Sequence, residues 1–254
     1  MKKALLALGA VLVVLALAVA ALFAVTFGGL KAIEDGQELG GGARVVRDGF
    51  VAAYLLPSSD NVVALVDCGN DAQATAILAA LKKRGLGADA VRVILLTHGH
   101  ADHTAGCHNF PLATVYAFAQ DKGLALGTEH AHGPLTSFSQ TPPEKRTKVD
   151  QLLVDGESIN LGTLQVRAFA VPGHTAGSAA FVANEVLYLG DSAGITSDGK
   201  LRPAPWIFTD DPAQNRAQLK GLAARLTREK LAVKQLAPSH SGVGEGLDAL
   251  TNFD

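Results

Sequence analysis

Blocks of hydrophobic and polar residues along the chain predict an α/β protein. Residues 44–56 and 61–69 have the pattern of two strands joined by a Pro-Ser-Ser-Asp turn, and helical spacing follows Asp71 until Gly85. Further strands are predicted at 91–98, 113–118, 164–173 and 233–238, a hairpin at 179–191 with its turn near Ala183-Asn184, and a helix after Asp211-Pro212. Strand pairs with intervening helices indicate two sheets covered by helices in one domain.

The N-terminal segment differs from the rest of the chain. Lys2 and Lys3 precede an apolar run over residues 4–27 that contains no charge. As a helix rising about 1.5 Å per residue, this run would span roughly 36 Å, more than the bilayer core of about 30 Å. Cleavage at the Ala18-Val19-Ala20 site would leave an apolar new terminus, so an uncleaved membrane anchor is favoured over a signal peptide. A buried core helix is the disfavoured alternative.

The two lysines place the following residues outside the cytoplasm. Positive charge stays on the cytoplasmic side of an apolar segment, so the catalytic part is expected on the extracytoplasmic, periplasmic side, membrane-anchored or secreted. Residues 31–43 are polar and glycine-rich, which is typical of a tether. The expected organisation is therefore an anchor or signal peptide at 1–30, a tether at 31–43 and one folded domain at 44–254.

Composition excludes several classes of protein. The chain has 254 residues, of which 48% are hydrophobic and 18% charged, and its net charge is -2. This composition is too apolar for a disordered chain, and the chain carries no cationic excess with which to neutralise nucleic-acid phosphates. Two cysteines are too few to build a disulfide scaffold.

The strongest chemical signal lies between Thr97 and His103. Three of the eight histidines fall in these seven residues, beside an aspartate, where an apolar strand ends. His98 and His100 alternate along extended backbone, so they can hold one ion together. Imidazole and carboxylate are ligands that Zn²⁺ takes. The candidate ligands, each at or directly after a predicted strand end, are His98, His100, Asp102, His103, His174, Asp191 and His240. Seven ligands are too many for one tetrahedral ion and suit two ions that share a carboxylate.

In their order along the chain these motifs resemble the metallo-β-lactamase superfamily. The resemblance covers VDCG (66–69), THGHADH (97–103), the PGHTAGS histidine, the GDS aspartate and the late histidine. It implies an αββα four-layer sandwich with a two-metal site along its edge. It also implies that His98, His100 and His174 hold one divalent ion, that Asp102, His103 and His240 hold the other, and that Asp191 bridges the two ions. The resemblance further implies that Asp67 supports residues 97–103, the metal loop. Zinc is the expected ion, with iron or manganese as alternatives.

The ligand set implies hydrolysis. Two cations lower the pKa of a shared water, and the resulting hydroxide attacks a carbonyl or phosphorus centre, with Asp102 as the hypothetical catalytic group that orients it or takes its proton. The resemblance implies that β-lactamases usually have cysteine or serine in place of Asp191, whereas the bridging aspartate is similar to the glyoxalase II, lactonase and phosphodiesterase branches. Glyoxalase II normally adds a helical substrate domain, but only 14 residues follow His240.

The resulting expectation is an exported binuclear metal-dependent hydrolase of a small ester, lactone, thiolester or similar bond. A β-lactamase, a one-iron sulfur dioxygenase and a non-catalytic metal-binding member of the fold are the alternatives. Nucleic acid is not an expected partner, whereas the membrane is, through residues 4–27.

Several further residues invite a functional reading that the sequence does not favour. His130 and His132 are expected on a solvated loop, His108 on a helix surface and Tyr188 in packing. Trp206 is expected to pack, with a substrate-facing position as the alternative. The resemblance places Cys68 and Cys107 each beside a family motif, where they either pair or remain free thiols.

Overall fold

The computed structural model describes residues 2–138 and 140–253. By its internal contacts the chain divides into two compact units, Met1–Leu30 and Lys31–Asp254. The ends of the predicted first and last segments, Met1 and Asp254, lie outside the described residues.

The first unit contains helix α1 (Lys2–Phe27). Alanine and leucine, which have high helix propensity, dominate its sequence, and the Thr26 hydroxyl donates to the carbonyl of Leu22 one turn earlier. The side chains of α1 are described from Val11 onward. Among the described residues, no helix combines the length and the hydropathy needed to cross a bilayer. The anchor at residues 4–27 stays a prediction.

The described part of the second unit contains two six-stranded sheets and one two-stranded sheet. The first sheet has the spatial order β1 (Arg44–Asp48), β2 (Val51–Ser59), β3 (Val62–Val66), β4 (Val91–Leu95), β5 (Thr114–Ala117), β6 (Gln151–Leu152). The second has the order β14 (Gly244–Glu245), β13 (Gln235–Pro238), β10 (Val186–Gly190), β9 (Ala179–Ala183), β8 (Leu164–Ala170), β7 (Ser158–Leu161). The small sheet pairs β11 (Ala193–Ile195) with β12 (Leu201–Pro203).

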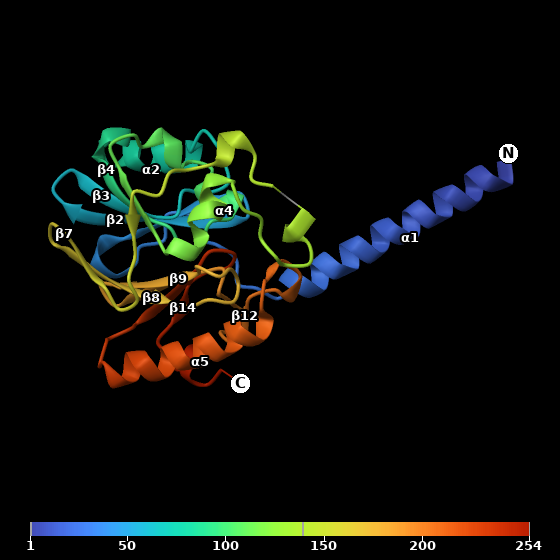
Figure 1. The fold of residues 1–254 in the computed structure, drawn as a ribbon. Coiled ribbons are helices and arrows are strands. Elements are labelled where there is room, and N and C mark those ends of the chain that lie inside the picture. The colour runs from blue at the N-terminus through green and yellow to red at the C-terminus, as the bar shows by residue number, and fades with distance from the viewer. Residues whose placement is uncertain (1, 139, 254) are drawn as a thin grey trace. The chain divides into compact units, whose positions relative to one another are not determined.

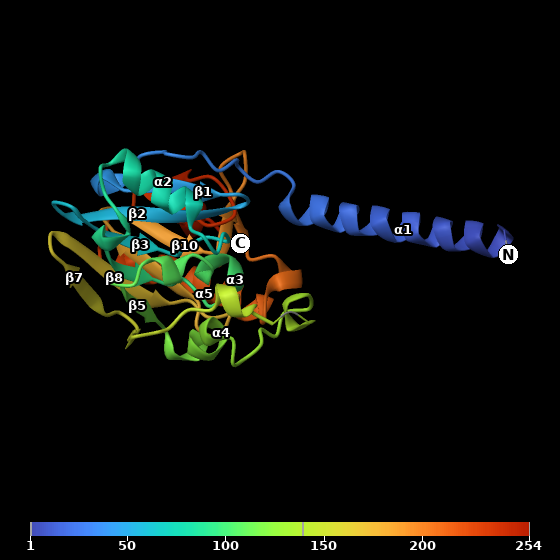
Figure 2. The same cartoon turned by 90° about the horizontal axis from the view of Figure 1, so that it is seen from above.

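Helices cover the outer faces of the two large sheets, as Figures 1 and 2 show for this unit. Helices α2 (Thr75–Lys83) and α4 (Lys122–Leu126) lie on the side of the first sheet, and the short helix α3 (Ala101–Thr104), labelled in Figure 2, follows β4. Helices α5 (Pro212–Arg228) and α6 (Asp248–Thr251) lie on the side of the second sheet. The predicted αββα sandwich is therefore the fold observed.

Buried apolar side chains of the described residues form three clusters, one for each interface between layers. The cluster between the sheets includes Tyr54 and Phe181, the cluster under α2 includes Ile77, and the cluster under α5 includes Leu219 and Leu222. Burying each such side chain contributes about 1.5–3 kcal/mol. The two sheets are thus held face to face, which fixes the loops at their common edge.

The structure corrects the prediction for residues 44–56. They form two strands rather than one, because the chain reverses between Asp48 and Val51, which are paired across a hairpin. The Asp48-Gly49 dipeptide is a turn signal that the continuous apolar pattern obscured. Strand β7, residues 158–161, was also not predicted, because its exposed polar positions at the edge of the sheet resemble a loop.

Residues 31–43, for which the sequence predicts a tether, are instead part of the folded unit. The Lys31 amide donates to the carbonyl of Ile195, and the Gly36 amide donates to that of Val45. Leu39 is 5% exposed and packs in the cluster between the sheets. Glycines in this segment serve tight turns rather than flexibility.

Candidate metal centre

All seven predicted ligands lie in segments that follow the carboxyl ends of strands, with Asp102 and His103 in helix α3. Strands β3 and β4 run parallel, as do β10 and β13, and β8 shares the direction of β10 because β9 lies antiparallel between them. Carboxyl ends of strands with a common direction meet at one edge of a sheet. The two sheets thereby bring five loops, carrying the ligands and Asp67, to a single site.

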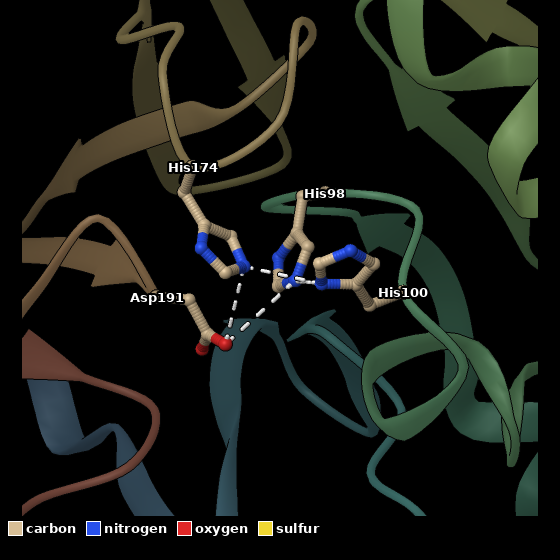
Figure 3. Close-up of side chains that lie close together, drawn as sticks. All are labelled: His98, His100, His174 and Asp191. Atoms are coloured by element: carbon tan, nitrogen blue, oxygen red, sulfur yellow. Dashed lines mark hydrogen bonds and ion pairs between the residues drawn. The ribbon is translucent and has the colours of Figure 1, made fainter. Parts of the chain in front are cut away.

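The first ligand group contains His98, His100, His174 and Asp191, which point toward one another in Figure 3. The His100 Nδ1 atom lies 3.0 Å from His98 Nε2 and 3.1 Å from His174 Nε2. Asp191 Oδ2 lies 3.4 Å from His174 Nε2 and 3.8 Å from His98 Nε2. His98 and His174 are buried, while His100 is half-buried at the edge of the group.

The second ligand group contains Asp102, His103, Asp191 and His240. His240 Nε2 lies 3.0 Å from Asp191 Oδ2 and 3.3 Å from Asp102 Oδ2. His103 Nε2 lies 3.2 Å from Asp191 Oδ1 and 3.7 Å from Asp102 Oδ2. The Asp102 side chain is 25% exposed, against 9% for Asp191, so Asp102 is the carboxylate of this centre that faces solvent most.

These distances fit divalent ions. A tetrahedral ion bound at about 2.0–2.1 Å separates its ligand atoms by roughly 3.3 Å. The buried atoms His103 Nε2 and Asp191 Oδ1 face each other at 3.2 Å, yet neither makes a hydrogen bond within the described structure. Polar atoms that converge at this spacing without hydrogen bonds are the arrangement expected of two ligands to one ion.

Hydrogen bonds at the far side of the rings set the orientation of four histidines. In each of them Nδ1 is the contacting atom. His98 contacts Thr97 Oγ1 at 3.1 Å, and His103 contacts Asp67 Oδ2 at 2.8 Å. His174 contacts Thr209 Oγ1 at 3.4 Å, and His240 contacts the carbonyl of Phe50 at 3.0 Å. Such partners fix the tautomer that presents the Nε2 lone pair to a metal. The fifth histidine, His100, presents Nδ1 instead.

Asp67 makes hydrogen bonds to Thr97 and His103, at the two ends of the segment from Thr97 to His103. Its Oδ1 accepts from the Thr97 amide at 2.8 Å, and its Oδ2 accepts from the Thr97 hydroxyl at 2.7 Å. Asp67 itself has a φ of 60°, a strained value for a non-glycine residue. The hydrogen-bond network to Thr97 and His103 is what compensates that strain.

Cys68 and Cys107 form a disulfide, the pairing that the sequence left open. Both cysteines are buried, and 39 residues separate them along the chain. The disulfide joins the end of the Asp67 loop to the segment that follows α3, so it closes the metal loop covalently at its base.

Burial and neighbouring charges divide the imidazoles into two kinds. Burial lowers the pKa of His174 to about 3 and holds that of His98 well below its usual range, so both are neutral at pH 7. For His240, burial opposes protonation, but the carboxylates of Asp191 and Asp102 raise the pKa to about 10. The pKa of His103 is likewise raised against burial by Asp191 and Asp102.

The two groups should therefore respond differently to pH. Without metal, His103 and His240 carry protons that a metal ion must displace, so affinity at the second group should rise with pH by up to about tenfold per unit for each displaced proton. His98 and His174 of the first group are already neutral at pH 7, so these two imidazoles should release no proton when a metal binds there. Calorimetry in buffers of different ionisation enthalpy measures the protons released; release of none would contradict this division.

The remaining histidines lie outside both ligand groups. His108, His130 and His132 are exposed, and among the described residues no group of candidate ligands includes them. Tyr188 is 1% exposed and packs edge-on against Tyr54, as predicted.

Trp206 lies in the region after Asp191, and the sequence left open whether it packs or faces the substrate. Trp206 is 59% exposed, so it does not pack as expected. It begins the 3-10 turn η7 (Trp206–Phe208), just ahead of Thr209, the partner of His174. Asp211 caps α5 by accepting from the Gln214 amide at 2.9 Å, in line with the predicted helix start.

Sequence reasoning missed two of the supporting contacts. The Phe50 carbonyl leaves no sequence signal because any residue supplies a carbonyl, and its contact with His240 spans 190 positions. The Phe50 ring also stacks on the His240 imidazole at 5.6 Å between centroids, and its exposed face forms an apolar wall beside the second group. Thr209 is one of many threonines in the sequence, and only the fold brings it to His174.

Known proteins are similar to this chain in sequence and in fold. The sequence model described as "Metallo-beta-lactamase superfamily" matches residues 46–240. The hydroxyacylglutathione hydrolase of Photobacterium profundum is 29% identical over 171 residues, which are 67% of this chain and 56% of that protein. The enzyme of the same name from Aeromonas hydrophila is 33% identical over 169 residues, 65% of this chain and 53% of that protein. The chain spans about half the length of the curated relatives it matches.

Solved structures agree in fold. The metallo-beta-lactamase SMB-1 is 27% identical, with a TM-score of 0.62 over 83% of this chain and 81% of that chain. The Rm3 metallo-beta-lactamase is 24% identical, with a TM-score of 0.61 over 83% of this chain and 79% of that chain. The four-layer sandwich is thus shared across nearly the whole folded unit.

Proposed function

The chain belongs to the metallo-beta-lactamase superfamily, and on that premise we propose that it is a hydrolase dependent on two divalent metal ions. The first ion would be held by His98, His100 and His174, the second by Asp102, His103 and His240, with Asp191 between them. Zinc suits this set of imidazole and carboxylate ligands, and iron or manganese can take the same donors.

One observation carries the proposal: Asp191 Oδ2 belongs to both ligand groups. It lies 3.4 Å from His174 Nε2 on one side and 3.0 Å from His240 Nε2 on the other. A carboxylate in that position would serve as a ligand in both groups. Without cations, two carboxylates and five imidazoles desolvated in one place would repel or require protonation.

Two ions held in this way would supply a nucleophile at neutral pH and would polarise the bond to be cleaved. The chain's own residues provide the rest. Asp191 is nearly buried and lies between four imidazoles, so its carboxylate would hold the two ligand groups at a fixed separation. The imidazoles are those of His98, His103, His174 and His240. Asp102 reaches solvent, so its carboxylate can orient the attacking water and accept its proton.

We favour a small acyl substrate: a thiolester, an ester or a lactone. The hydroxyacylglutathione hydrolases among the relatives carry a name that denotes thiolester cleavage, and the bridging aspartate accords with that branch. The exposed Phe50 ring, stacked on His240, offers apolar surface beside the centre for the non-reacting part of such a substrate. A β-lactamase is the second candidate, favoured by the SMB-1 and Rm3 structures.

A panel of chromogenic substrates tests the proposal. The metal-loaded protein should hydrolyse at least one thiolester, ester or lactone and should lose that activity to a chelator. Turnover of nitrocefin in preference to every acyl substrate would replace this assignment with a β-lactamase. Silence on all classes with both metals bound would favour a non-catalytic member of the fold.

We also propose that the folded unit is exported. The uncharged run at residues 4–27 behind two lysines supports export, and so does the buried disulfide, because disulfides persist in oxidising compartments. Fractionation of expressing bacteria provides the test. Export predicts the folded, disulfide-bonded protein outside the cytoplasm, whereas a soluble cytoplasmic protein with reduced Cys68 and Cys107 would contradict it.

A further inference from the structure

Asp121 is a buried carboxylate that the metal centre does not use as a ligand. It is 2% exposed and ends the 3-10 turn η4 (Ala119–Asp121), between strand β5 and helix α4. Burial of a carboxylate is costly unless hydrogen bonds compensate it, so its partners indicate its purpose.

The partners of Asp121 come from the two loops that carry the first ligand group. Its Oδ2 accepts from the Gly99 amide at 2.7 Å and from the Thr175 hydroxyl at 2.7 Å, and its Oδ1 accepts from the Gly177 amide at 2.6 Å. Gly99 stands between His98 and His100, and Thr175 follows His174 directly. One side chain therefore connects the two loops that carry the three imidazoles of that group, and these loops come from different sheets.

Small residues make this approach possible. A Cβ atom on Gly99 would lie 2.8 Å from the Ala125 amide nitrogen and 2.9 Å from the Asp121 carbonyl oxygen. A Cβ atom on Gly177 would lie 2.6 Å from both the Asp121 amide nitrogen and Oδ1. Both contacts are too short for a side chain, so both loops are packed directly onto the backbone around Asp121.

The second ligand group has different supports. His103 is oriented by Asp67, and His240 by the Phe50 carbonyl. Among the hydrogen bonds described for Asp121, none reaches Asp102, His103 or His240. Asp67 also reaches the first group through Thr97, the partner of His98, whereas the hydrogen bonds of Asp121 reach only the loops that carry His98, His100 and His174.

We propose that Asp121 is a positioning residue that sets the affinity of the first metal site by holding the His98–His100 loop and the His174 loop in register. This inference rests on the proposed two-metal centre. The carboxylate accepts three hydrogen bonds and fixes two backbone amides. Its effect on the metal passes through the positions of the imidazoles, not through contact with the ion.

Asp121→Asn provides the test, because it preserves size but replaces one acceptor oxygen with a donor. Whichever way the amide turns, its NH₂ group faces the amide of Gly99 or of Gly177. In a titration of metal-free protein with Zn²⁺ against a chromophoric chelator, one binding step should weaken about 10–100-fold, while the other should change less than about threefold. Repeating the titration in the His240→Ala background, which removes a ligand of the second group, assigns the weakened step.

Two further variants keep the test decisive. Asp150→Asn is the matched control. The Asp150 carboxylate also accepts a hydrogen bond from a backbone amide, that of Val115 on strand β5, at 2.9 Å. No hydrogen bond described for Asp150 reaches either ligand loop. This variant should leave both steps unchanged. Thr175→Val removes one bond to Asp121 at constant size and should weaken the same step by a smaller factor, about three- to tenfold. It carries the test if Asp121→Asn does not fold.

The possible outcomes are distinct. A selective loss in one step supports the positioning role. A lower thermal midpoint of the metal-free Asp121→Asn protein with both steps unchanged would show a merely structural role and overturn the inference. Wild-type protein that binds fewer than two Zn²⁺ ions would contradict the proposed centre itself, whatever the variants do.

Discussion

Replacing Asp191 with alanine is expected to lower hydrolytic activity by a factor of about 10³ or more and to reduce the bound metal below two equivalents. The Asp191 carboxylate faces both ligand groups, with Oδ2 at 3.4 Å from His174 Nε2 and 3.0 Å from His240 Nε2. Removing it leaves each group a ligand short. A metal contributes several kcal/mol to stabilising the transition state, and each step of about 1.36 kcal/mol is tenfold in rate. Elemental analysis and turnover of the preferred substrate measure the two effects.

Asp198→Ala is the matched control for that variant. Asp198 follows on the same segment, and its side chain is 58% exposed and paired with Lys200 at 2.7 Å. Its loss should change neither metal content nor rate. An Asp191→Ala protein that keeps two metals and wild-type turnover would exclude the bridging role.

Removing the disulfide is expected to lower the free energy of unfolding by about 4 kcal/mol. The disulfide closes a loop across a sequence separation of 39 residues, and the chain-entropy relation gives about this value for such a loop. The test uses the double variant Cys68→Ala with Cys107→Ala, because serine at either position would leave a buried hydroxyl. Chemical denaturation of the metal-free protein measures the change, and the reduced wild-type protein should match the double variant.

One result would contradict the prediction that the disulfide stabilises the protein. If the double variant, the reduced protein and the oxidised protein unfold at the same denaturant concentration, the pair adds nothing to stability. In that case Asp67 and its hydrogen bonds would suffice to hold the base of the metal loop.

Local sequence signals identified the candidate ligands because these residues follow the ends of strands. The run from Thr97 to His103 follows a buried strand, and His174, Asp191 and His240 each follow another. Whether they converge depends on strand direction. The resemblance to a known family supplied that information, and the topology then showed it.

Residues that act through long-range contacts were not predictable. Asp121 has the sequence surroundings of a loop, and its partners Gly99 and Thr175 lie 22 and 54 positions away. The pairing of Cys68 with Cys107 depends on a distance that no sequence pattern encodes. Residues 31–43 have the composition of a tether, yet Leu39 inserts between the sheets. In each case tertiary contacts override the local preference.

The central claim is that two cations share Asp191, and metal stoichiometry tests it most directly. Protein purified without chelator, then saturated with Zn²⁺ and freed of excess, should contain two equivalents per chain by elemental analysis. The Asp102→Ala and His100→Ala variants should each contain fewer. A wild-type protein that binds no metal, or holds only one equivalent at saturation, would contradict the account.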